Sequence, residues 1–222
     1  DATESAALHI TDGGIGVDTA DYSATVGAGV TVDLTTGTAT GGDATGDVLS
    51  AIENVVGTGA ADTLTGNTSD NRLDGLGGND SLTGGAGADV LNGDADDDTL
   101  IGGAGADTLN GGDGVDTASY ATSLTRVFAF LNDVVSNTGD AGGDTYDSIE
   151  NLIGTEDAGN GDSLAGNAGN NRIEGLAGSD ILTGGGGQDT LIGGDGNDSL
   201  DGGDDNDTLN GGDGGDFSII GG

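Results

Sequence analysis

Apolar side chains recur at a fixed spacing of nine residues along much of the chain, set among Gly, Asp, Asn and Thr. Seven nine-residue units follow one another from Gly57 to Ser119, and the clearest read GGAGADVLN (84–92) and GGAGADTLN (102–110). Leu stands at position 8 of every unit in this run except the last, which has Ala118. A single apolar residue in so short a repeat predicts a stack of short strands, each turning one side chain inward.

A second run of seven units extends from Asp157 to Ile219, and a lone unit, GGIGVDTAD, occupies residues 13–21. Position 6 is Asp throughout both runs except for Asn71 and Asn171. Position 8 of the second run is Leu or Ile except for Ser218 in its last unit, as expected where a coil ends. This strict register indicates a repeat architecture.

A longer repeat lies above the nonapeptide, because AIENVVGT (51–58) matches SIENLIGT (148–155) and GVDTADYS (16–23) matches GVDTASYA (114–121). We therefore divide the chain into two modules. The predicted divisions are a first module at 1–119, with the lone unit at 13–21, a spacer at 22–56 and seven units at 57–119, and a second module at 120–222, with a spacer at 120–156 and seven units at 157–219.

Alternating apolar residues in the spacers predict short strands that continue the coil. They are Val30, Val32 and Leu34 in the first spacer and Val127, Ala129 and Leu131 in the second. Phe128 and Phe130 make both faces of the second strand apolar. We expect these two rings either to pack internally or to contact a neighbouring module or chain.

Within each unit, positions 1 to 6 predict a Gly-rich turn and positions 7 to 9 a three-residue strand. Gly suits this turn because it adopts positive φ without a steric penalty. Two units complete one coil, so unit i lies under unit i+2 and strands stack about 4.8 Å apart in two parallel sheets. The predicted fold is all-β: a right-handed parallel β-roll (β-solenoid) built from GGxGxDxUx repeats, with two longer strand-containing spacers.

The charge excludes several classes of function. A formal charge of -37, with 40 acidic residues against three Arg and no Lys, opposes binding to nucleic acid or to an anionic membrane surface. No Cys is present, which excludes disulfides and thiolate metal sites. Such a chain buries too little apolar surface to offset its conformational entropy and self-repulsion, so folding requires neutralisation.

A bound cation supplies that neutralisation. Stacked turns present position-6 carboxylates together with backbone carbonyls, and such an all-oxygen set suits a hard cation with six or more ligands. Calcium fits this description, whereas Mg²⁺ demands tighter octahedral geometry and zinc favours His or Cys ligands. We therefore expect a chain that is largely disordered without calcium and folds on binding it.

The motif GGxGxDxUx resembles the RTX (hemolysin-type) calcium-binding nonapeptide-repeat family, across the residues of both tandem runs. The resemblance implies a calcium ion between turns i and i+2, held by both position-6 side chains and by carbonyls of positions 1 to 4. The implied side-chain ligands are Asp62, Asn71, Asp80, Asp89, Asp98, Asp107, Asp116, Asp162, Asn171, Asp180, Asp189, Asp198, Asp207 and Asp216. The implied backbone ligands are Gly75, Gly77, Gly84, Gly85, Gly87, Gly102, Gly103, Gly105, Gly111, Gly112, Gly114, Gly184, Gly185, Gly187, Gly193, Gly194, Gly196, Gly202, Gly203 and Gly211.

Some turns depart from the pattern. Asn71 and Asn171 offer an amide oxygen without charge, so we expect weaker sites there. Position 4 is not Gly at Ala60, Ser69, Asp96, Asn160 and Asp205. Five ions in each run, about ten in all, would reduce the charge of -37 to about -17.

Other interpretations of these residues are less favourable. Gly- and Asp-rich sequence is typical of disordered linkers, but a linker needs no nine-residue register. Paired carboxylates also occur in glycosidases, yet with so many Asp residues some pairs arise by chance, and we predict no enzyme activity. His9 is the only imidazole, and its alternation with apolar residues favours a partly covered edge-strand position over a ligand or base. Arg72 and Arg172 occupy position 7 of matched units, so we expect them to pair with nearby carboxylates.

Two functions remain open. The first is a calcium-binding extracellular structural protein, such as a filament, surface-layer or adhesin rod, whose partners are copies of itself end to end or a cell-surface or matrix component. The second is a non-catalytic folding and secretion module of a larger type I-secreted enzyme or toxin, which the RTX resemblance implies. Either function predicts a secreted bacterial protein outside the cell or on its surface. The chain starts at Asp1 and ends at GGDGGDFSIIGG, where a further module would enter its spacer, so we expect a segment of a longer protein.

Overall fold

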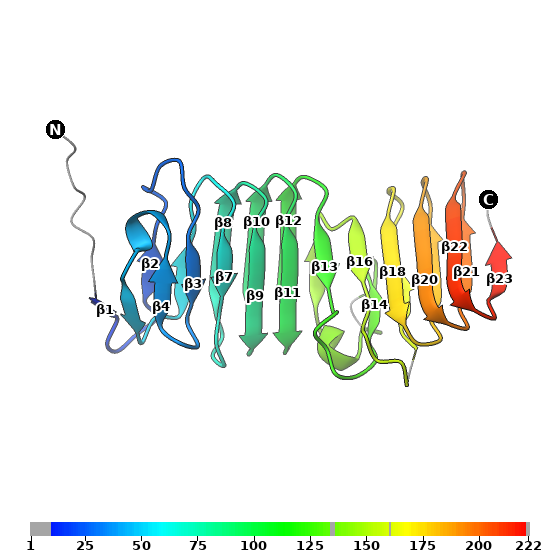
Figure 1. Ribbon diagram of the computed structural model, residues 1–222, viewed down its shortest axis with the longest axis horizontal. Coiled ribbons are helices and arrows are strands. Elements are labelled where there is room, and N and C mark those ends of the chain that lie inside the picture. The colour runs from blue at the N-terminus through cyan, green and yellow to red at the C-terminus, as the bar shows by residue number, and fades with distance from the viewer. Residues whose placement is uncertain (1–9, 134–135, 160, 221–222) are drawn as a thin grey trace.

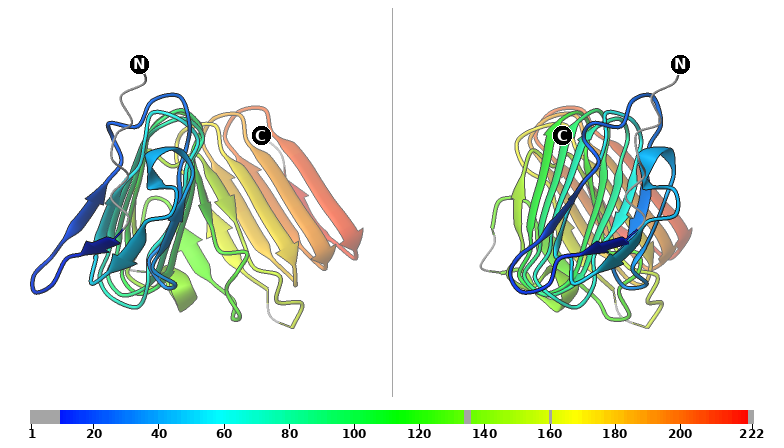
Figure 2. Two further views of the ribbon diagram at one scale, coloured as in Figure 1. Left: turned by 60° about the vertical axis from the view of Figure 1, so that its left-hand side comes forward. Right: turned by 90° about the vertical axis from the view of Figure 1, so that its left-hand side faces the viewer.

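The computed structural model describes residues 10–133, 136–159 and 161–220, so the prediction for His9 lies outside the described residues. The described chain forms an elongated stack of coils with its strands across the long axis (Figure 1). Viewed along that axis, successive coils lie behind one another (Figure 2). Almost all strand pairs are parallel, which confirms the predicted β-solenoid.

One 12-stranded sheet runs through both modules. Its strands, in spatial order, are β1 (Ile10–Asp12), β5 (Val48–Ser50), β4 (Thr38–Thr40), β3 (Thr31–Asp33), β7 (Thr63–Thr65), β9 (Ser81–Ala86), β11 (Thr99–Ala104), β13 (Thr117–Ser119), β16 (Asn151–Ile153), β18 (Arg172–Ala177), β20 (Thr190–Gly196) and β22 (Thr208–Gly214).

The other side of the coil carries two shorter sheets. The first contains β15 (Thr145–Asp147), β12 (Thr108–Asp113), β10 (Val90–Ala95), β8 (Arg72–Gly77), β6 (Asn54–Val56) and β2 (Thr19–Asp21). The second contains β14 (Phe128–Phe130), β17 (Ser163–Ala165), β19 (Ile181–Gly185), β21 (Ser199–Gly203) and β23 (Phe217–Ile220). Two short 3-10 turns, η1 (Gly42–Ala44) and η2 (Gly139–Ala141), lie in the spacers.

Position-8 side chains form the core between the sheets. Leu73 lies beside Leu91 and Leu91 beside Leu109, so stacked residues are 18 apart and two units complete one coil, as predicted. The position-8 residues that are at most 1% exposed are Leu64, Leu73, Leu82, Leu91, Leu100, Leu109, Ala118, Leu164, Ile173, Leu182, Leu191 and Leu200. Each regular coil therefore has two of these aliphatic side chains in its interior, one from each unit.

The strands are longer than the sequence predicted. In β8 to β12 and in β18 to β22, each strand covers positions 7 to 9 and continues into the Gly-rich start of the next unit. The pairing of β8 with β10 joins Asp74 to Asn92 and Leu76 to Asp94 but leaves out Gly75 and Gly93. Position 1 is thus unpaired in both strands with the register unchanged, and the turn proper is shorter than the predicted positions 1 to 6.

The spacers continue the coil through β3 and β14, which pair in parallel with β7 and β17. Val30, Val32, Val127 and Ala129 are buried, as the alternating pattern predicted. The first spacer also contains an antiparallel segment, β3–β4–β5, that the sequence did not predict. On the outer face of β14, the Arg126 guanidinium lies 4.8 Å from the centre of the half-buried Phe128 ring.

The two modules are offset by half a coil. The AIEN strand β6 lies in the six-stranded sheet, whereas the matching SIEN strand β16 lies in the 12-stranded sheet. Since β13 of the first module pairs directly with β16 of the second, the long sheet crosses the module boundary without a break. The chain is therefore one continuous solenoid.

A cavity in the middle of the stack should lower the stability of the fold. Leu100→Ala is expected to lower the free energy of unfolding by about 2–5 kcal/mol, because the fully buried side chain has no neighbour able to fill its place. Leu124→Ala serves as the matched control, since Leu124 is 91% exposed and should change stability by no more than about 0.5 kcal/mol. Denaturant unfolding in calcium-containing buffer measures both. Equal losses for the two variants would contradict this account of the core.

Candidate metal centre

The position-6 side chains are buried in rows along the edge of the stack. Those at most 3% exposed are Asp62, Asn71, Asp80, Asp89, Asp98, Asp107, Asp116, Asp162, Asn171, Asp180, Asp189 and Asp198. Asp207 and Asp216 are half-buried. The fold therefore removes from water a set of carboxylates whose charges have the same sign, which is costly unless each is compensated.

One oxygen of each carboxylate is used by the backbone of the coil before it. The N–H of Asp62 donates to Oδ1 of Asp80 at 2.7 Å, Asp80 to Asp98 at 2.7 Å, and Asp98 to Asp116 at 2.8 Å. The same bond joins Asp89 to Asp107, at 2.8 Å. This ladder fixes the position and rotamer of every carboxylate.

The second oxygen of each regular carboxylate is buried without a hydrogen-bond partner. The oxygens concerned are Oδ2 of Asp80, Asp89, Asp98, Asp107, Asp116, Asp180, Asp189 and Asp198. A buried carboxylate oxygen without a donor is rare in proteins and indicates a missing ion or water.

A backbone carbonyl of the next coil lies beside seven of these eight oxygens, all but that of Asp107. A methyl group on Gly75 would collide with Oδ2 of Asp80 and with the carbonyl oxygen of Gly93, so both oxygens face the same small space. Gly93, Asp98 and Gly111 repeat the arrangement one coil further. Two acceptors converge on each space with no donor between them, which fits a cation and explains Gly at position 1.

Side chains alone do not form a metal centre in the described chain. No group of three or more His, Cys, Asp or Glu side chains there is arranged to hold an ion. A cation between turns must therefore take backbone carbonyls as well as carboxylates, and this mixed oxygen set suits calcium and not zinc. The residues present fit the calcium ion that the sequence predicted.

Position 2 gives the regular turns their shape. It adopts positive φ in all ten regular turns, at Leu76, Gly85, Asp94, Gly103, Gly112, Leu176, Gly185, Gly194, Gly203 and Gly212. Among the position-4 departures, Asp96 and Asp205 also adopt positive φ, of 76° and 74°, and so preserve the turn. Asn160 lies outside the described residues.

The first turn of each run is built differently. Thr58 donates its N–H to Oδ2 of Asp62 at 2.5 Å and its hydroxyl to Oδ1 at 3.1 Å, while the Val30 N–H donates to Oδ1 at 2.6 Å. Both oxygens of Asp62 are therefore satisfied by the protein. This turn lacks the unpartnered oxygen that marks the regular turns.

The same arrangement surrounds Asp162, which accepts the N–H groups of Thr155 at 2.6 Å and Val127 at 2.8 Å. Gly154 corresponds to Gly57 in its contacts. A methyl group on Gly57 would meet Oδ2 of Asp62, one on Gly154 would meet Oδ2 of Asp162, and each would also meet a carbonyl oxygen of the following coil. Gly154 thus takes the place of position 1, and the turn from Gly154 to Asp162 is three residues longer than the turn from Gly57 to Asp62.

The second turn of each run carries Asn at position 6, and the protein satisfies this amide too. Oδ1 of Asn71 accepts the N–H of Asn67 at 2.7 Å, and Nδ2 donates to the carbonyl of Glu53 at 2.8 Å. Asn171 makes the same bonds, at 2.8 Å each. Both ends of the amide are therefore satisfied by the protein, while Oδ1 lies on the side of the Gly84 carbonyl.

Sequence reasoning missed Asp144, which continues a row into the second spacer. It is fully buried, and its Oδ1 accepts the N–H of Asp107 at 2.9 Å, as a position-6 Asp would. Its Oδ2 accepts the Tyr120 hydroxyl at 2.8 Å. The only signal in the sequence is the match between GDATGD (42–47) and GDAGGD (139–144).

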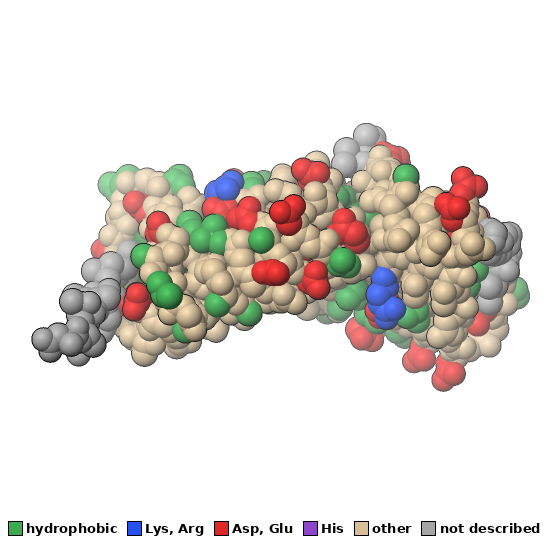
Figure 3. All heavy atoms as spheres, turned by 90° about the horizontal axis from the view of Figure 1, so that it is seen from above, with side chains coloured by type: hydrophobic (Ala, Val, Ile, Leu, Met, Phe, Trp, Pro, Cys, Tyr) green, Lys and Arg blue, Asp and Glu red, His purple; other side chains and the backbone are tan. Residues whose placement is uncertain are grey.

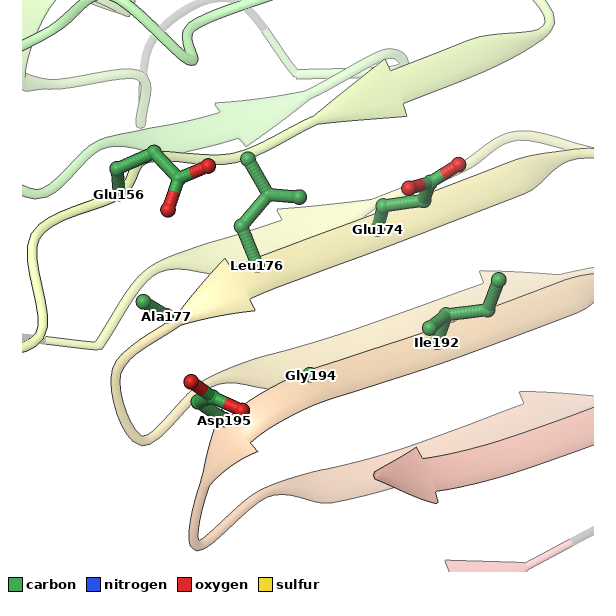
Figure 4. A pocket seen from close by; sticks show the side chains of 7 residues that line it. All are labelled: Glu156, Glu174, Leu176, Ala177, Ile192, Gly194 and Asp195. Atoms are coloured by element: carbon green, nitrogen blue, oxygen red, sulfur yellow. The ribbon is translucent and has the colours of Figure 1, made fainter. Parts of the chain in front are cut away.

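The outer surface is acidic, with few basic side chains (Figure 3). Arg72 pairs with Asp74 at 2.7 Å and Arg172 with Glu174 at 2.6 Å, which confirms the predicted ion pairs. Glu174 also lines an open hollow on β18 and β20, where Glu156 and Asp195 are the other carboxylates (Figure 4). The hollow holds no nucleophile and base in contact.

Burial raises the pKa of the row. It brings the pKa of Asp80 to about 7 and those of Asp89, Asp98 and Asp180 to about 6, with further increases from neighbouring carboxylates. The unfolded chain holds these groups near an ordinary pKa of about 3.9. Proton binding therefore favours the folded state at pH values between the pKa of the unfolded chain and the raised pKa of the folded chain.

Acidification should stabilise the fold when cations are absent. As the pH falls from about 7.5 to 5, the folded chain takes up protons that the unfolded chain does not, so its stability rises. Circular dichroism in metal-free buffer should show more β-structure at pH 5 than at pH 7.5. A loss of structure over this range would contradict the cost assigned to the buried carboxylates.

The sequence model of the RTX calcium-binding nonapeptide repeat matches four stretches, residues 56–91, 83–118, 157–191 and 183–217, which together cover more than half of the chain. No curated protein matches the chain. In the described part of the chain, no helix has the length and apolar character needed to cross a membrane. The repeats, the stacked coils and the paired oxygens agree, and the chain belongs to the family of proteins with RTX calcium-binding nonapeptide repeats.

Proposed function

We propose that the chain is an extracellular structural protein that folds on binding calcium and serves as a rod in a filament, surface layer or adhesin. The observation that carries the calcium part is a set of six buried Oδ2 atoms, those of Asp80, Asp89, Asp98, Asp180, Asp189 and Asp198. Each lacks a donor and faces a glycine carbonyl of the next coil. A divalent cation in each space would turn a repulsive row into an attractive one.

The ligands we propose are the carboxylates of consecutive coils and the position-1 carbonyl between them. The pairs within the runs are Asp80–Asp98, Asp89–Asp107, Asp98–Asp116, Asp180–Asp198, Asp189–Asp207 and Asp198–Asp216. The first two turns of each run need no ion, because their side chains are satisfied by the protein, through Thr58 and Asn71 in one run and Thr155 and Asn171 in the other. The number of proposed sites in the runs is therefore smaller than the ten that the repeats alone predict.

A structural role is supported by the continuity of the solenoid. The 12-stranded sheet passes from one module to the next through the β13–β16 pair, so modules 1–119 and 120–222 form a single rod. We propose no catalytic role, because ion binding accounts for the carboxylates that lie close together.

The second candidate is a non-catalytic folding and secretion module of a larger type I-secreted protein. Membership of the RTX family favours it, since proteins with these repeats are typically secreted in this way. The two candidates share calcium-dependent folding and differ in whether the folded chain assembles.

A calcium titration tests both. Circular dichroism should change from disordered to β-rich as calcium is added, because neutralisation allows the carboxylates to be buried. Light scattering recorded with it should show growth in particle size for a self-assembling rod. The same folding with a monomeric particle would favour the secretion module, and a spectrum unaffected by calcium and by chelator would exclude calcium-dependent folding.

Charge removal at one ligand should weaken folding by calcium. Asp98→Asn removes a carboxylate shared by two proposed sites, so the calcium concentration at the folding midpoint should rise about tenfold, equivalent to about 1.4 kcal/mol. Asp113→Asn is the control, since Asp113 is exposed on the following turn and the change in charge is the same. Equal midpoints for the two variants would argue against Asp98 as a ligand.

A further inference from the structure

Glu53 and Glu150 lie outside the nonapeptide units, in the matched segments AIEN and SIEN, yet they take the place of a position-6 Asp. Oε2 of Glu53 accepts the N–H of Asp18 at 2.9 Å, and Oε2 of Glu150 accepts the N–H of Asp116 at 2.9 Å. In the regular turns the N–H of one position-6 residue donates in the same way to the carboxylate of the next coil. The two Glu carboxylates therefore continue the rows beyond the repeats.

The carbonyl groups of Ala51 and Ser148 replace the position-1 carbonyl of a regular turn. A methyl group on Gly111 would meet the Ser148 carbonyl oxygen and Oδ2 of Asp116. On Gly13 it would meet the Ala51 carbonyl oxygen and the side chain of Asp18. These are the contacts that Gly75 makes with Gly93 and Asp80 in the regular row.

The remaining carboxylate of each set has an unpartnered oxygen. Asp116 is 0% exposed, and its Oδ2 is buried with no hydrogen-bond partner. Oδ2 of Asp18 is also buried without a partner, although Asp18 belongs to the lone unit and not to a tandem run. The same arrangement thus occurs twice, 98 residues apart, with an oxygen aimed into each space.

The length of the Glu side chain has a geometric reason. In a regular turn four residues separate the carbonyl-bearing Gly93 from Asp98, whereas only Ile52 separates Ala51 from Glu53. Ala51 and Ser148 adopt φ of 52° and 51°, which turns the chain sharply before strands β6 and β16. With so short a turn, the additional methylene of Glu brings the carboxylate to the row.

We propose that Glu53 and Glu150 complete two further calcium sites, one with Asp18 and the Ala51 carbonyl and one with Asp116 and the Ser148 carbonyl. This inference rests on the proposed calcium binding and extends it to residues outside the repeats. Each site joins the coil before a spacer to the last strand of that spacer, β2 to β6 and β13 to β16. Calcium at these points fixes the spacers to the stack and links the two modules.

The test is the number of calcium ions bound by the full chain at saturation, measured by native mass spectrometry. Glu53→Gln/Glu150→Gln is expected to bind two ions fewer than the wild type, and Glu150→Gln one fewer, because Gln keeps the acceptor oxygen but loses the charge. Glu156→Gln is the matched control, since Glu156 is exposed, and should bind the wild-type number. Circular dichroism confirms that each variant is folded.

A folded double variant that binds as many ions as the wild type would overturn this inference and leave the proposed function intact. A wild-type chain that binds no calcium would overturn the proposed function itself. If the double variant does not fold, the wild-type protein crystallised with calcium decides the question by anomalous scattering. A peak between Asp116 Oδ2 and the Glu150 carboxylate is expected, and an empty position there in a crystal with ions in the regular turns would overturn the inference.

Discussion

The structure depends on the burial of carboxylates in rows. In the regular turns one oxygen of the position-6 Asp accepts the N–H of the preceding coil, and in seven of these turns the other oxygen faces a carbonyl without a donor. Such an arrangement is repulsive alone and strongly attractive around a divalent cation. The apolar interior cannot compensate, because each unit contributes one Leu or Ile while nine residues must be ordered. Under the proposed function, cation binding and folding are therefore one process in this chain.

The remaining features of the repeat follow from the space that the cation requires. Position 1 is Gly because a methyl group would fill that space, and position 1 is left out of the strand ladder so that its carbonyl can face the carboxylate. Position 2 adopts positive φ, which brings the chain back into register with the neighbouring strand. Leu76, Asp94 and Leu176 adopt this conformation although it is strained for residues other than Gly. The strict repeat is thus a constraint on backbone shape more than on side-chain packing.

The parts of this structure that follow the nine-residue period could be predicted from the sequence. The inward Leu residues, the 18-residue stacking, the spacer strands at Val32 and Ala129 and the Arg72 and Arg172 ion pairs all depend on that period. The longer strands, the antiparallel β3–β4–β5 segment and the role of Asp144 could not be predicted. They depend on the sign of φ at single residues or on hydrogen bonds between positions 37 residues apart. Neither of these produces a periodic pattern in the sequence. The period also does not reveal that the turn closed by Thr155 is three residues longer than the turn closed by Thr58.

The ends of the rows show that a protein donor and a cation are alternative solutions to one problem. At Asn71, Nδ2 donates to the carbonyl of Glu53 and the N–H of Asn67 donates to Oδ1, so no acceptor is left unpaired. At Asp62, Thr58 supplies the donors. The turns of Asp62 and Asn71 have Thr or Asn at position 2 and lack its positive φ. The regular turns have positive φ there, and in eight of them Oδ2 of the position-6 Asp is buried without a donor. Under the proposed calcium binding, positions 2 and 6 therefore determine whether a turn is closed by the protein alone, as at the start of each run, or by an ion, as along its length.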